Sequence, residues 1–283
     1  MYKYLRKVSE KLLLKLLGLQ FESKLNTLST KLPPSPYFLT KSKFFILRSL
    51  TTNYLSSTGW WQSCLYSRAI NAQGDALSLL TYPAIAFVEK LDLKEKVVLE
   101  FGSGASTFYF EKKCKNLYSY EFSKDWYDSL ANAVGQNTRM ELVDSSVMKE
   151  LIAHENSESL SQLFEYDCRH NFALEVGNAA FSFLDLLSNI YRAGIVLIDG
   201  GPRNTLMALV AKYCKPGTFI IIDNSDATHN HLGLEHFGSQ SFLGVPFKGH
   251  GPMNSWEWET SIYWKLDSAS IPSIGKSWGA LFK

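Results

Sequence analysis

The chain has 283 residues, of which 46 % are hydrophobic and 14 % aromatic, so it carries enough apolar material for a sizeable core. The formal net charge of +2 hides an asymmetry: residues 1–50 hold ten lysines and arginines against Glu10 and Glu22, and the remaining 233 residues hold nineteen basic against twenty-five acidic side chains. An acidic body excludes a general nucleic-acid binder, and we expect no nucleic-acid partner.

The four cysteines lie far apart and form no Cys-x-x-Cys pair, so neither a zinc site nor a disulfide framework is predicted. No apolar run reaches the ~18–20 residues that span a membrane. The N-terminal segment lacks the small-residue cleavage site of a signal peptide. These features favour a protein of the reducing cytoplasm.

Residues 1–36 are predicted to form a basic amphipathic helical arm and a proline-rich linker. Residues 2–18 have helical periodicity and end at Gly18, and Leu32-Pro33-Pro34-Ser35-Pro36 follows as a stiff connection. One helix face carries leucines and a valine and the other carries lysines. Such a helix either lies on an anionic membrane surface, as a peripheral contact, or packs on its own domain or on a partner subunit of the same chain. Both interpretations stay open.

Residues 37–74 are rich in aromatic side chains, including Trp60 and Trp61. Aromatic residues at this place either form a lid over an active site or pack against the edge of a sheet. A helix that ends near Leu91 then leads into the main domain, expected from residue 75 to residue 283.

The centre of the main domain is the stretch Val97–Ser106. Val97, Val98 and Leu99 predict a strand buried on both faces, Glu100, Gly102 and Gly104 form a glycine turn, and a helix starts near Ser106. Glycines let a backbone approach a ligand closely. A second strand, residues 117–121, ends in Glu121, where a carboxylate can accept hydrogen bonds from both ribose hydroxyls.

The turn departs from the dinucleotide pattern Gly-x-Gly-x-x-Gly, because Thr107 takes the place of the third glycine. It resembles motif I of the class I S-adenosylmethionine (SAM)-dependent methyltransferases, Glu/Asp-x-Gly-x-Gly-x-Gly. Glu100, Gly102 and Gly104 match this motif, and Ser106 replaces its last glycine. The resemblance implies an α/β fold: a Rossmann-like, seven-stranded sheet, mostly parallel with the last strand antiparallel, and helices on both faces.

A third strand is predicted at residues 139–143 and is followed by Asp144. The resemblance implies that Asp144 contacts the adenine amino group, whereas its position also suits the N-cap of a helix. Residues 145–190 are longer than a minimal connection and have little periodicity around residues 154–177. They form either a surface excursion or part of an acceptor pocket, and a helix is expected over residues 179–190.

Two further buried strands are predicted at residues 195–198 and 219–222, ending in Asp199 and Asp223. Strands that alternate with helices form a parallel sheet, and ligands bind at the carboxyl ends of its strands. Glu100, Glu121, Asp199 and Asp223 should therefore line one rim. Residues 242–265 predict two closing strands, with the last at residues 260–264.

Asp199 together with Asp223-Asn224 resembles the metal site of the catechol and caffeoyl-CoA type O-methyltransferases, and oxygen ligands suit Mg²⁺. That family has a lysine or a similar base shortly after the aspartate of the fourth strand. Here Arg203 stands nearby and cannot act as a base at neutral pH. His229, His231 and His250 are candidate bases, with surface or structural roles as the alternative.

Taken together, the pattern predicts a SAM-dependent methyltransferase that methylates an oxygen of a small hydroxylated acceptor such as a sugar, with assistance from Mg²⁺. The alternatives are an NAD(P)-dependent oxidoreductase and a non-catalytic partner-binding module on a degenerate fold. The predicted catalytic residues are Asp199, His229 and His250. The predicted metal ligands are Asp199, Asp223 and Asn224. The predicted cofactor-binding residues are Glu100, Phe101, Gly102, Ser103, Gly104, Ser106, Glu121, Asp144 and Asp199.

Overall fold

The computed structural model describes residues 54–170 and 181–267. The chain divides between Tyr54 and Leu55 into two units, and the second unit contains the β-sheet. The predicted arm over residues 1–36 lies outside the described residues. Within the described part of the chain, no helix is long and apolar enough to cross a membrane.

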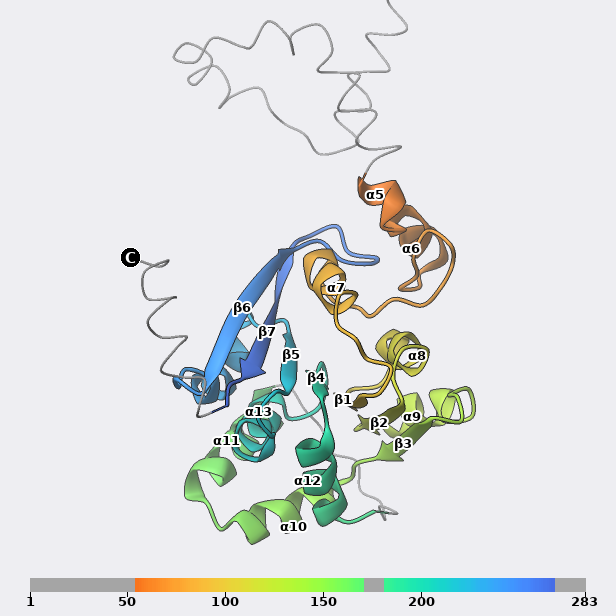
Figure 1. The fold of residues 1–283 in the computed structure, drawn as a ribbon. Coiled ribbons are helices and arrows are strands. Elements are labelled where there is room, and N and C mark those ends of the chain that lie inside the picture. The colour runs from red at the N-terminus through yellow and green to blue at the C-terminus, as the bar shows by residue number, and fades with distance from the viewer. Residues whose placement is uncertain (1–53, 171–180, 268–283) are drawn as a thin grey trace, which may run out of the picture. The chain divides into compact units, whose positions relative to one another are not determined.

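In the described residues, seven strands form one sheet in the order β3-β2-β1-β4-β5-β7-β6 (Figure 1). Strands β1 to β5 pair in parallel, and β7 lies antiparallel between β5 and β6. This confirms the predicted Rossmann-like methyltransferase sheet with an antiparallel last strand. The strands are β1 (Val97–Phe101), β2 (Asn116–Glu121), β3 (Thr138–Leu142), β4 (Ile195–Ile198), β5 (Phe219–Asp223), β6 (Phe242–Gly249) and β7 (Trp258–Lys265).

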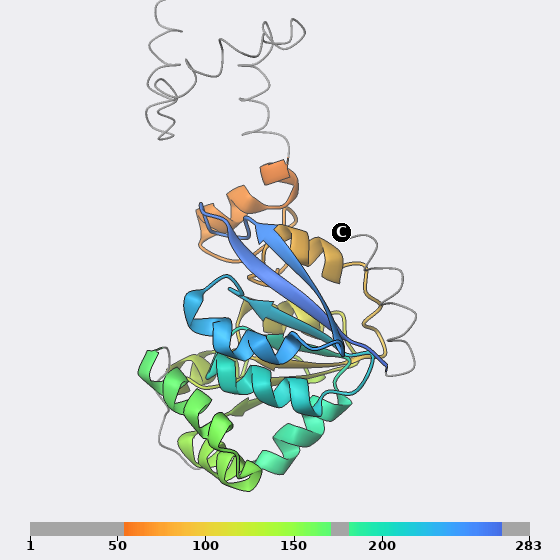
Figure 2. The same cartoon turned by 90° about the vertical axis from the view of Figure 1, so that its left-hand side faces the viewer.

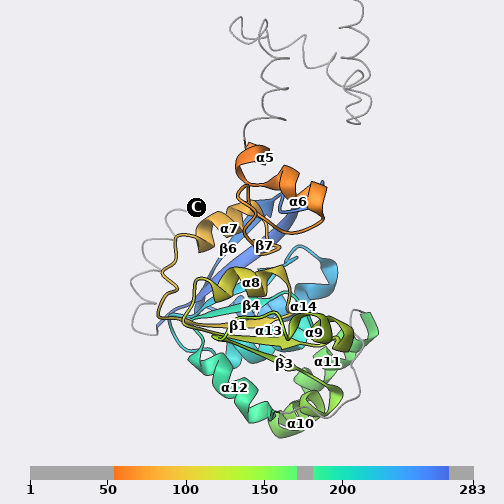
Figure 3. The same ribbon diagram turned by 90° about the vertical axis from the view of Figure 1, so that its right-hand side faces the viewer.

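Helices cover both faces of the sheet (Figure 3). Helices α7 and α8 pack on one face, α10, α12 and α13 pack on the other, and α11 contacts α13. The helices before β3 are α5 (Tyr54–Ser57), α6 (Trp60–Tyr66), α7 (Tyr82–Val88), α8 (Ala105–Glu111) and α9 (Lys124–Leu130). The later ones are α10 (Ser145–Glu155), α11 (Glu158–His170), α12 (Phe183–Arg192), α13 (Arg203–Tyr213) and α14 (His231–Leu234), with 3-10 turns η1 (Thr228–Asn230) and η2 (Glu235–Phe237).

The central parallel strands are mostly apolar because both of their faces are covered. Val98 faces α7 and α8, whereas its neighbours Leu99 and Phe101 face the layer of α10, α12 and α13. All four residues of β4 are buried. Strands β6 and β7 are eight residues long and extend toward α6 and α7 (Figure 2). Trp60 of α6 donates its indole N–H to the carbonyl of Asn254, in the loop between these two strands, at 2.8 Å.

The segment after β3 differs from the expectation of weak periodicity, because it forms the helices α10 and α11. The next helix, α12, begins at Phe183, where Ser182 caps it by accepting a hydrogen bond from the amide of Asp185 at 3.3 Å. Trp126 of α9 is 51 % exposed, and its indole contacts the glycine turn that follows β1.

Candidate functional site

The turns after β1 and β4 touch at the carboxyl edge of the sheet. Gly102 has φ +92°, and a Cβ atom added to it would stand 2.7 Å from the amide nitrogen of Gly200. Side chains rarely adopt such a φ, and essentially no Cβ atom comes so close to a backbone atom. Glycines are therefore required at this crossing, which brings the ends of β1 and β4 together.

Glu100 is fully buried beneath the glycine turn. Its Oε2 accepts hydrogen bonds from Thr107 Oγ1 and Ser119 Oγ, both at 2.7 Å. Its Oε1 is buried without a hydrogen-bond partner among the described residues. Burial raises the pKa of Glu100 to about 7, and the charge of Glu121 raises this pKa further. The hydroxyl groups of Ser106, Ser119 and Thr107 act in the opposite direction and lower it.

Glu121, at the end of β2, ties that strand to the glycine turn. Its Oε2 accepts from the amide of Ser103 at 2.8 Å, and its Oε1 accepts from the amides of Phe122 and Ser123 at 2.8 and 2.9 Å. Trp126 donates its indole N–H to the carbonyl of Ser103 at 2.6 Å. The turn is thus held from both sides, and Glu121 lies where the sequence predicts it.

The other predicted cofactor residues fall into two groups. Gly104 is the N-cap of α8, and an added Cβ atom there would meet nothing within 4 Å. Ser103 and Ser106 are buried beside it, and the Ser103 hydroxyl lies 2.7 Å from that of Ser119. Phe101, by contrast, points to the opposite face of β1, where its ring stacks on Tyr120 with centroids 5.8 Å apart. Its side chain therefore belongs to the core and not to the turn.

Asp144 follows β3 and caps α10. Its Oδ1 accepts hydrogen bonds from the amides of Ser146 and Val147 at 2.9 and 3.3 Å. This confirms the interpretation of Asp144 as an N-cap. Its predicted contact with adenine stays a prediction.

Arg203, the first residue of α13, reaches back across the ends of β4 and β5. One terminal nitrogen, Nη1, donates to the carbonyl of Asp223 at 2.8 Å and to Asn224 Oδ1 at 3.1 Å. The other, Nη2, donates to Asp199 Oδ1 at 3.0 Å and also to the Asp199 carbonyl. The guanidinium therefore contacts all three of the residues predicted to ligate a metal.

Asp223 turns its carboxylate toward β7. Its Oδ1 accepts from Trp258 Nε1 at 2.9 Å and from Thr260 Oγ1 at 2.6 Å. One oxygen of Asp223 is therefore engaged by β7, and a guanidinium already lies among the three predicted ligands. The described residues contain no group of three or more histidine, cysteine, aspartate or glutamate side chains that could hold a metal ion. The predicted magnesium site does not fit this geometry.

The two aspartates at this edge are difficult to ionise together. Burial raises the pKa of Asp199 to about 8, and the charges of Asp223 and Glu100 add to that effect while Arg203 opposes it. Burial also raises the pKa of Asp223. Hydrogen bonds from Thr260 and Trp258 and the charge of Arg203 act in the opposite direction and lower this pKa. Carboxylates at the ends of three strands thus repel one another across a short distance.

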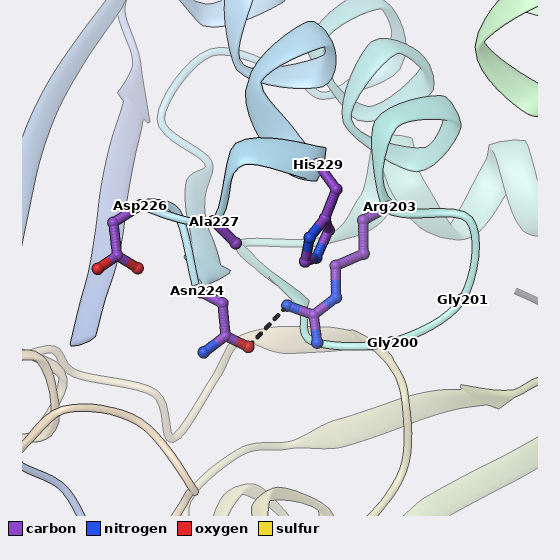
Figure 4. Close-up of a pocket in the computed structure, with 7 residues that line it drawn as sticks. All are labelled: Gly200, Gly201, Arg203, Asn224, Asp226, Ala227 and His229. Atoms are coloured by element: carbon purple, nitrogen blue, oxygen red, sulfur yellow. Dashed lines mark hydrogen bonds between the residues drawn. The ribbon is translucent and has the colours of Figure 1, made fainter. Parts of the chain in front are cut away.

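A pocket of about 450 Å³ opens beside this group of side chains (Figure 4). His229 lies in its wall next to Arg203, as the close-up shows. His231 is exposed and bonds the carbonyl of Thr228 through its own ring, and His250 is exposed in the loop after β6. Of the three candidate bases, His229 is the one that lines this pocket. The lining residues are Gly200, Gly201, Arg203, Asn224, Asp226, Ala227 and His229.

Several residues of this site were not predicted. Thr107, considered only as a break in the dinucleotide pattern, accepts from the amide of Gly104 at 2.9 Å and donates to Glu100. Thr107 stands three residues after Gly104, the N-cap of α8, and this capping-box spacing is a signal that could have revealed its role. Trp258 and Thr260, which hold Asp223, gave no local signal, because β7 is distant from β5 in the chain.

No protein-family model matches the chain, and no curated protein matches it. Among solved structures, it is similar to the O-methyltransferase TomG from Streptomyces achromogenes in complex with SAM, at 13 % identity and a TM-score of 0.42, over 80 % of this chain and 96 % of that one. It is also similar to a precorrin-6y C5,15-methyltransferase from Geobacter metallireducens, at 13 % identity and a TM-score of 0.40, over 68 % and 93 % of the two chains.

A third similar structure is an rRNA methylase from Streptococcus thermophilus, at 11 % identity and a TM-score of 0.38, over 67 % of this chain and all of that one. These values describe a distant likeness and do not identify an activity. The class of protein that the sheet itself defines is the Rossmann-like methyltransferase fold, with its antiparallel last strand.

Proposed function

We propose that this chain is a SAM-dependent methyltransferase. The observation that supports the proposal is the concentration of acidic side chains at the carboxyl edge of the sheet. Glu100, Glu121, Asp199 and Asp223 come from the ends of four adjacent strands, and the first, third and fourth have raised pKa values because they are buried. A ligand with positive charge relieves this repulsion.

SAM fits this requirement, because it carries a sulfonium and an ammonium group against a single carboxylate. A nicotinamide dinucleotide places a negatively charged pyrophosphate beside the turn after the first strand. Here that turn lies directly over Glu100, whose buried Oε1 has no partner among the described residues. The charge of the site thus favours the methyltransferase over the oxidoreductase.

Three features of the chain fit the cofactor. Glu121 ends β2 and can accept ribose hydroxyls, Gly104 leaves open space at the start of α8, and Glu100 supplies negative charge beneath the turn. When bound, SAM supplies a methyl group activated by its sulfonium charge. The residues of the turn, joined through Ser103 to Glu121, hold the adenosyl part in one orientation.

The acceptor is proposed to occupy the pocket beside Arg203. Its volume of about 450 Å³ suits a small molecule such as a sugar or another hydroxylated metabolite. His229 lines the pocket, and the unprotonated nitrogen of a neutral imidazole can accept a proton from a hydroxyl. Methylation of an acceptor oxygen is the proposed reaction, with His229 as the base.

Calorimetric titration of the full chain with SAM, S-adenosylhomocysteine and NADH tests the cofactor. We expect micromolar Kd values for the two adenosyl compounds and no heat with NADH. Glu121→Ala should weaken the binding of SAM about 10- to 100-fold, because the ribose hydroxyls lose hydrogen bonds to a charged acceptor. Glu150→Ala, at an exposed position of α10, is the matched control and should leave the Kd unchanged.

Binding of NADH without binding of either adenosyl compound would favour the oxidoreductase. If none of the three binds, the partner-binding module becomes the better hypothesis. Thermal melting of both variants shows whether a lost affinity comes from the site or from unfolding.

A further inference from the structure

The guanidinium of Arg203 lies at the place where the sequence predicts a metal ion. We propose that Arg203 substitutes for the divalent cation, as a fixed positive charge that joins the ends of β4 and β5, so that the site forms and works without a metal. The inference rests on the proposed function where it concerns methyl transfer. Its claim about cation binding stands on the geometry alone.

The contacts of Arg203 are those of an occupied cation site. Its two terminal nitrogens carry four N–H groups, and each nitrogen has two oxygen acceptors. The four acceptors are the carbonyl and Oδ1 of Asp199, the carbonyl of Asp223 and Oδ1 of Asn224. Carboxylate, carbonyl and amide oxygens of this kind are also what Mg²⁺ selects.

The chain holds this arginine in place from several directions. Arg203 precedes Asn204 and Thr205, whose amides both donate to the buried carboxylate of Asp167, at 3.3 and 2.9 Å. Asn224 has φ +52°, a left-handed conformation that asparagine tolerates better than most residues. The side chains of Arg203 and Asp199 are 18 % and 20 % exposed, so the contact between them is largely shielded from water.

The positive charge of Arg203 and the hydrogen bonds already made by the oxygen ligands both oppose binding of a second cation at this position. A divalent ion among these oxygens would stand close to the guanidinium and would be repelled by it. Asp223, a predicted ligand, already uses its Oδ1 to accept from Trp258 and Thr260. Binding of Mg²⁺ among these oxygens would require Arg203 to leave.

The substitution has a consequence for the acceptor. A metal ion favours acceptors with two adjacent oxygens, which bind it together and lose a proton easily. A guanidinium whose terminal N–H groups are all engaged offers no such chelation. The acceptor hydroxyl must then be held by the pocket wall and deprotonated by a side chain, the role proposed for His229.

The test is binding of Mn²⁺ to the full chain, followed by the loss of the free-ion signal in electron paramagnetic resonance. The wild-type chain should show no saturable site below millimolar concentration. Arg203→Ala removes the guanidinium and leaves its oxygen acceptors behind, so it should bind Mn²⁺ at least tenfold more tightly. Arg203→Gln, which keeps part of the side chain, serves as a second variant if Arg203→Ala does not fold. Arg169→Ala, at an exposed ion pair of α11, is the matched control.

Micromolar binding of one Mn²⁺ by the wild-type chain, lost in Asp199→Asn, would overturn the proposal. So would folded Arg203 variants that gain no affinity for Mn²⁺, because the guanidinium would then not be what excludes the ion. These measurements need no cofactor. A chain that fails to bind SAM but behaves as expected toward Mn²⁺ would refute the proposed function and leave the inference on the cation in place.

Discussion

Asp167 in α11 and Asn204 in the first turn of α13 form a buried hydrogen bond of 2.6 Å between Oδ1 and Nδ2. The same Asn204 amide group donates to the carbonyl of His229 at 2.8 Å, and Asn204 Oδ1 accepts from the amide of Gly233 at 2.7 Å. The segment after β3 is thus connected through two side chains to the wall of the pocket beside Arg203. None of the described residues 145–170 and 181–190 lines that pocket, and α11 contacts it only through Asn204.

Replacing Asp167 should destabilise the protein strongly. Its carboxylate is buried and accepts from the backbone amides and side chains of Asn204 and Thr205. Asp167→Asn puts an amide group against these donors, and we expect the free energy of unfolding to fall by about 2–4 kcal/mol. Urea unfolding measures the change. Glu165→Gln, an exposed position of the same helix, should alter it by less than ~0.5 kcal/mol, and an equal effect of both variants would contradict the prediction.

The crossing of the glycine turns can be tested with a matched pair of glycines. Gly102 and Gly74 have nearly the same φ, +92° and +90°, but an added Cβ atom would meet Gly200 at the first position and open space at the second. Gly74→Ala should therefore lose about 1–2 kcal/mol from backbone strain alone. Gly102→Ala should lose roughly 2 kcal/mol more and also bind SAM less tightly, because the turn must move. Equal losses in urea unfolding would show that the two turns do not press on each other.

The buried acids make stability depend on pH. Glu100 and Asp199 have pKa values raised to about 7 and about 8, whereas both groups ionise near pH 4 in an unfolded chain. Between these limits the folded chain keeps protons that the unfolded chain has lost, so the free energy of unfolding falls as the pH rises from about 4 to about 8 and then levels off. The ligand-free protein should be less stable at pH 9 than at pH 6.

Two variants isolate this contribution. Glu100→Gln and Asp199→Asn each remove one titrating group, and each should reduce the loss of stability between pH 6 and pH 9 by about 1 kcal/mol or more. Urea midpoints at the two pH values give the comparison, with Glu150→Gln as an exposed control. A pH dependence that is the same in all four proteins would show that these acids are ionised in the folded chain.

The parts of the fold that could be predicted are those whose signal is local. The run Ile195–Ile198 followed by Asp199 predicts a strand buried on both faces with an acid at its end, and this is what β4 is. The glycine turn and Glu121 were found in the same way. The fate of a polar side chain depends instead on partners far along the chain. The carboxylate of Asp223 accepts from Trp258 because β7 lies beside β5. The sequence of residues 219–226 contains no signal that predicts this contact.

Arg203 illustrates the same limit within a short distance. Its place four residues after Asp199 identified it as a neighbour of the site, yet whether a cation there is a metal ion or a guanidinium depends on where α13 begins. That start is fixed by Asp167, thirty-six residues earlier in sequence, in a helix that was not predicted. The resemblance on which the metal prediction rests covers the ligands and not the arginine side chain among them.

The contact between Trp60 and Asn254 offers a last prediction, on the segment before the sheet. The indole N–H of Trp60 donates to the Asn254 carbonyl in the loop after β6, while the neighbouring Trp61 is 37 % exposed. Trp60→Phe keeps an aromatic ring and removes the donor, so we expect a loss of about 1 kcal/mol in the free energy of unfolding and faster amide hydrogen exchange in residues 250–257. Trp61→Phe should change neither. If exchange in this loop is the same in both variants, the hydrogen bond does not order it, and the apolar packing of Trp60 is the contact that remains between this side chain and the domain.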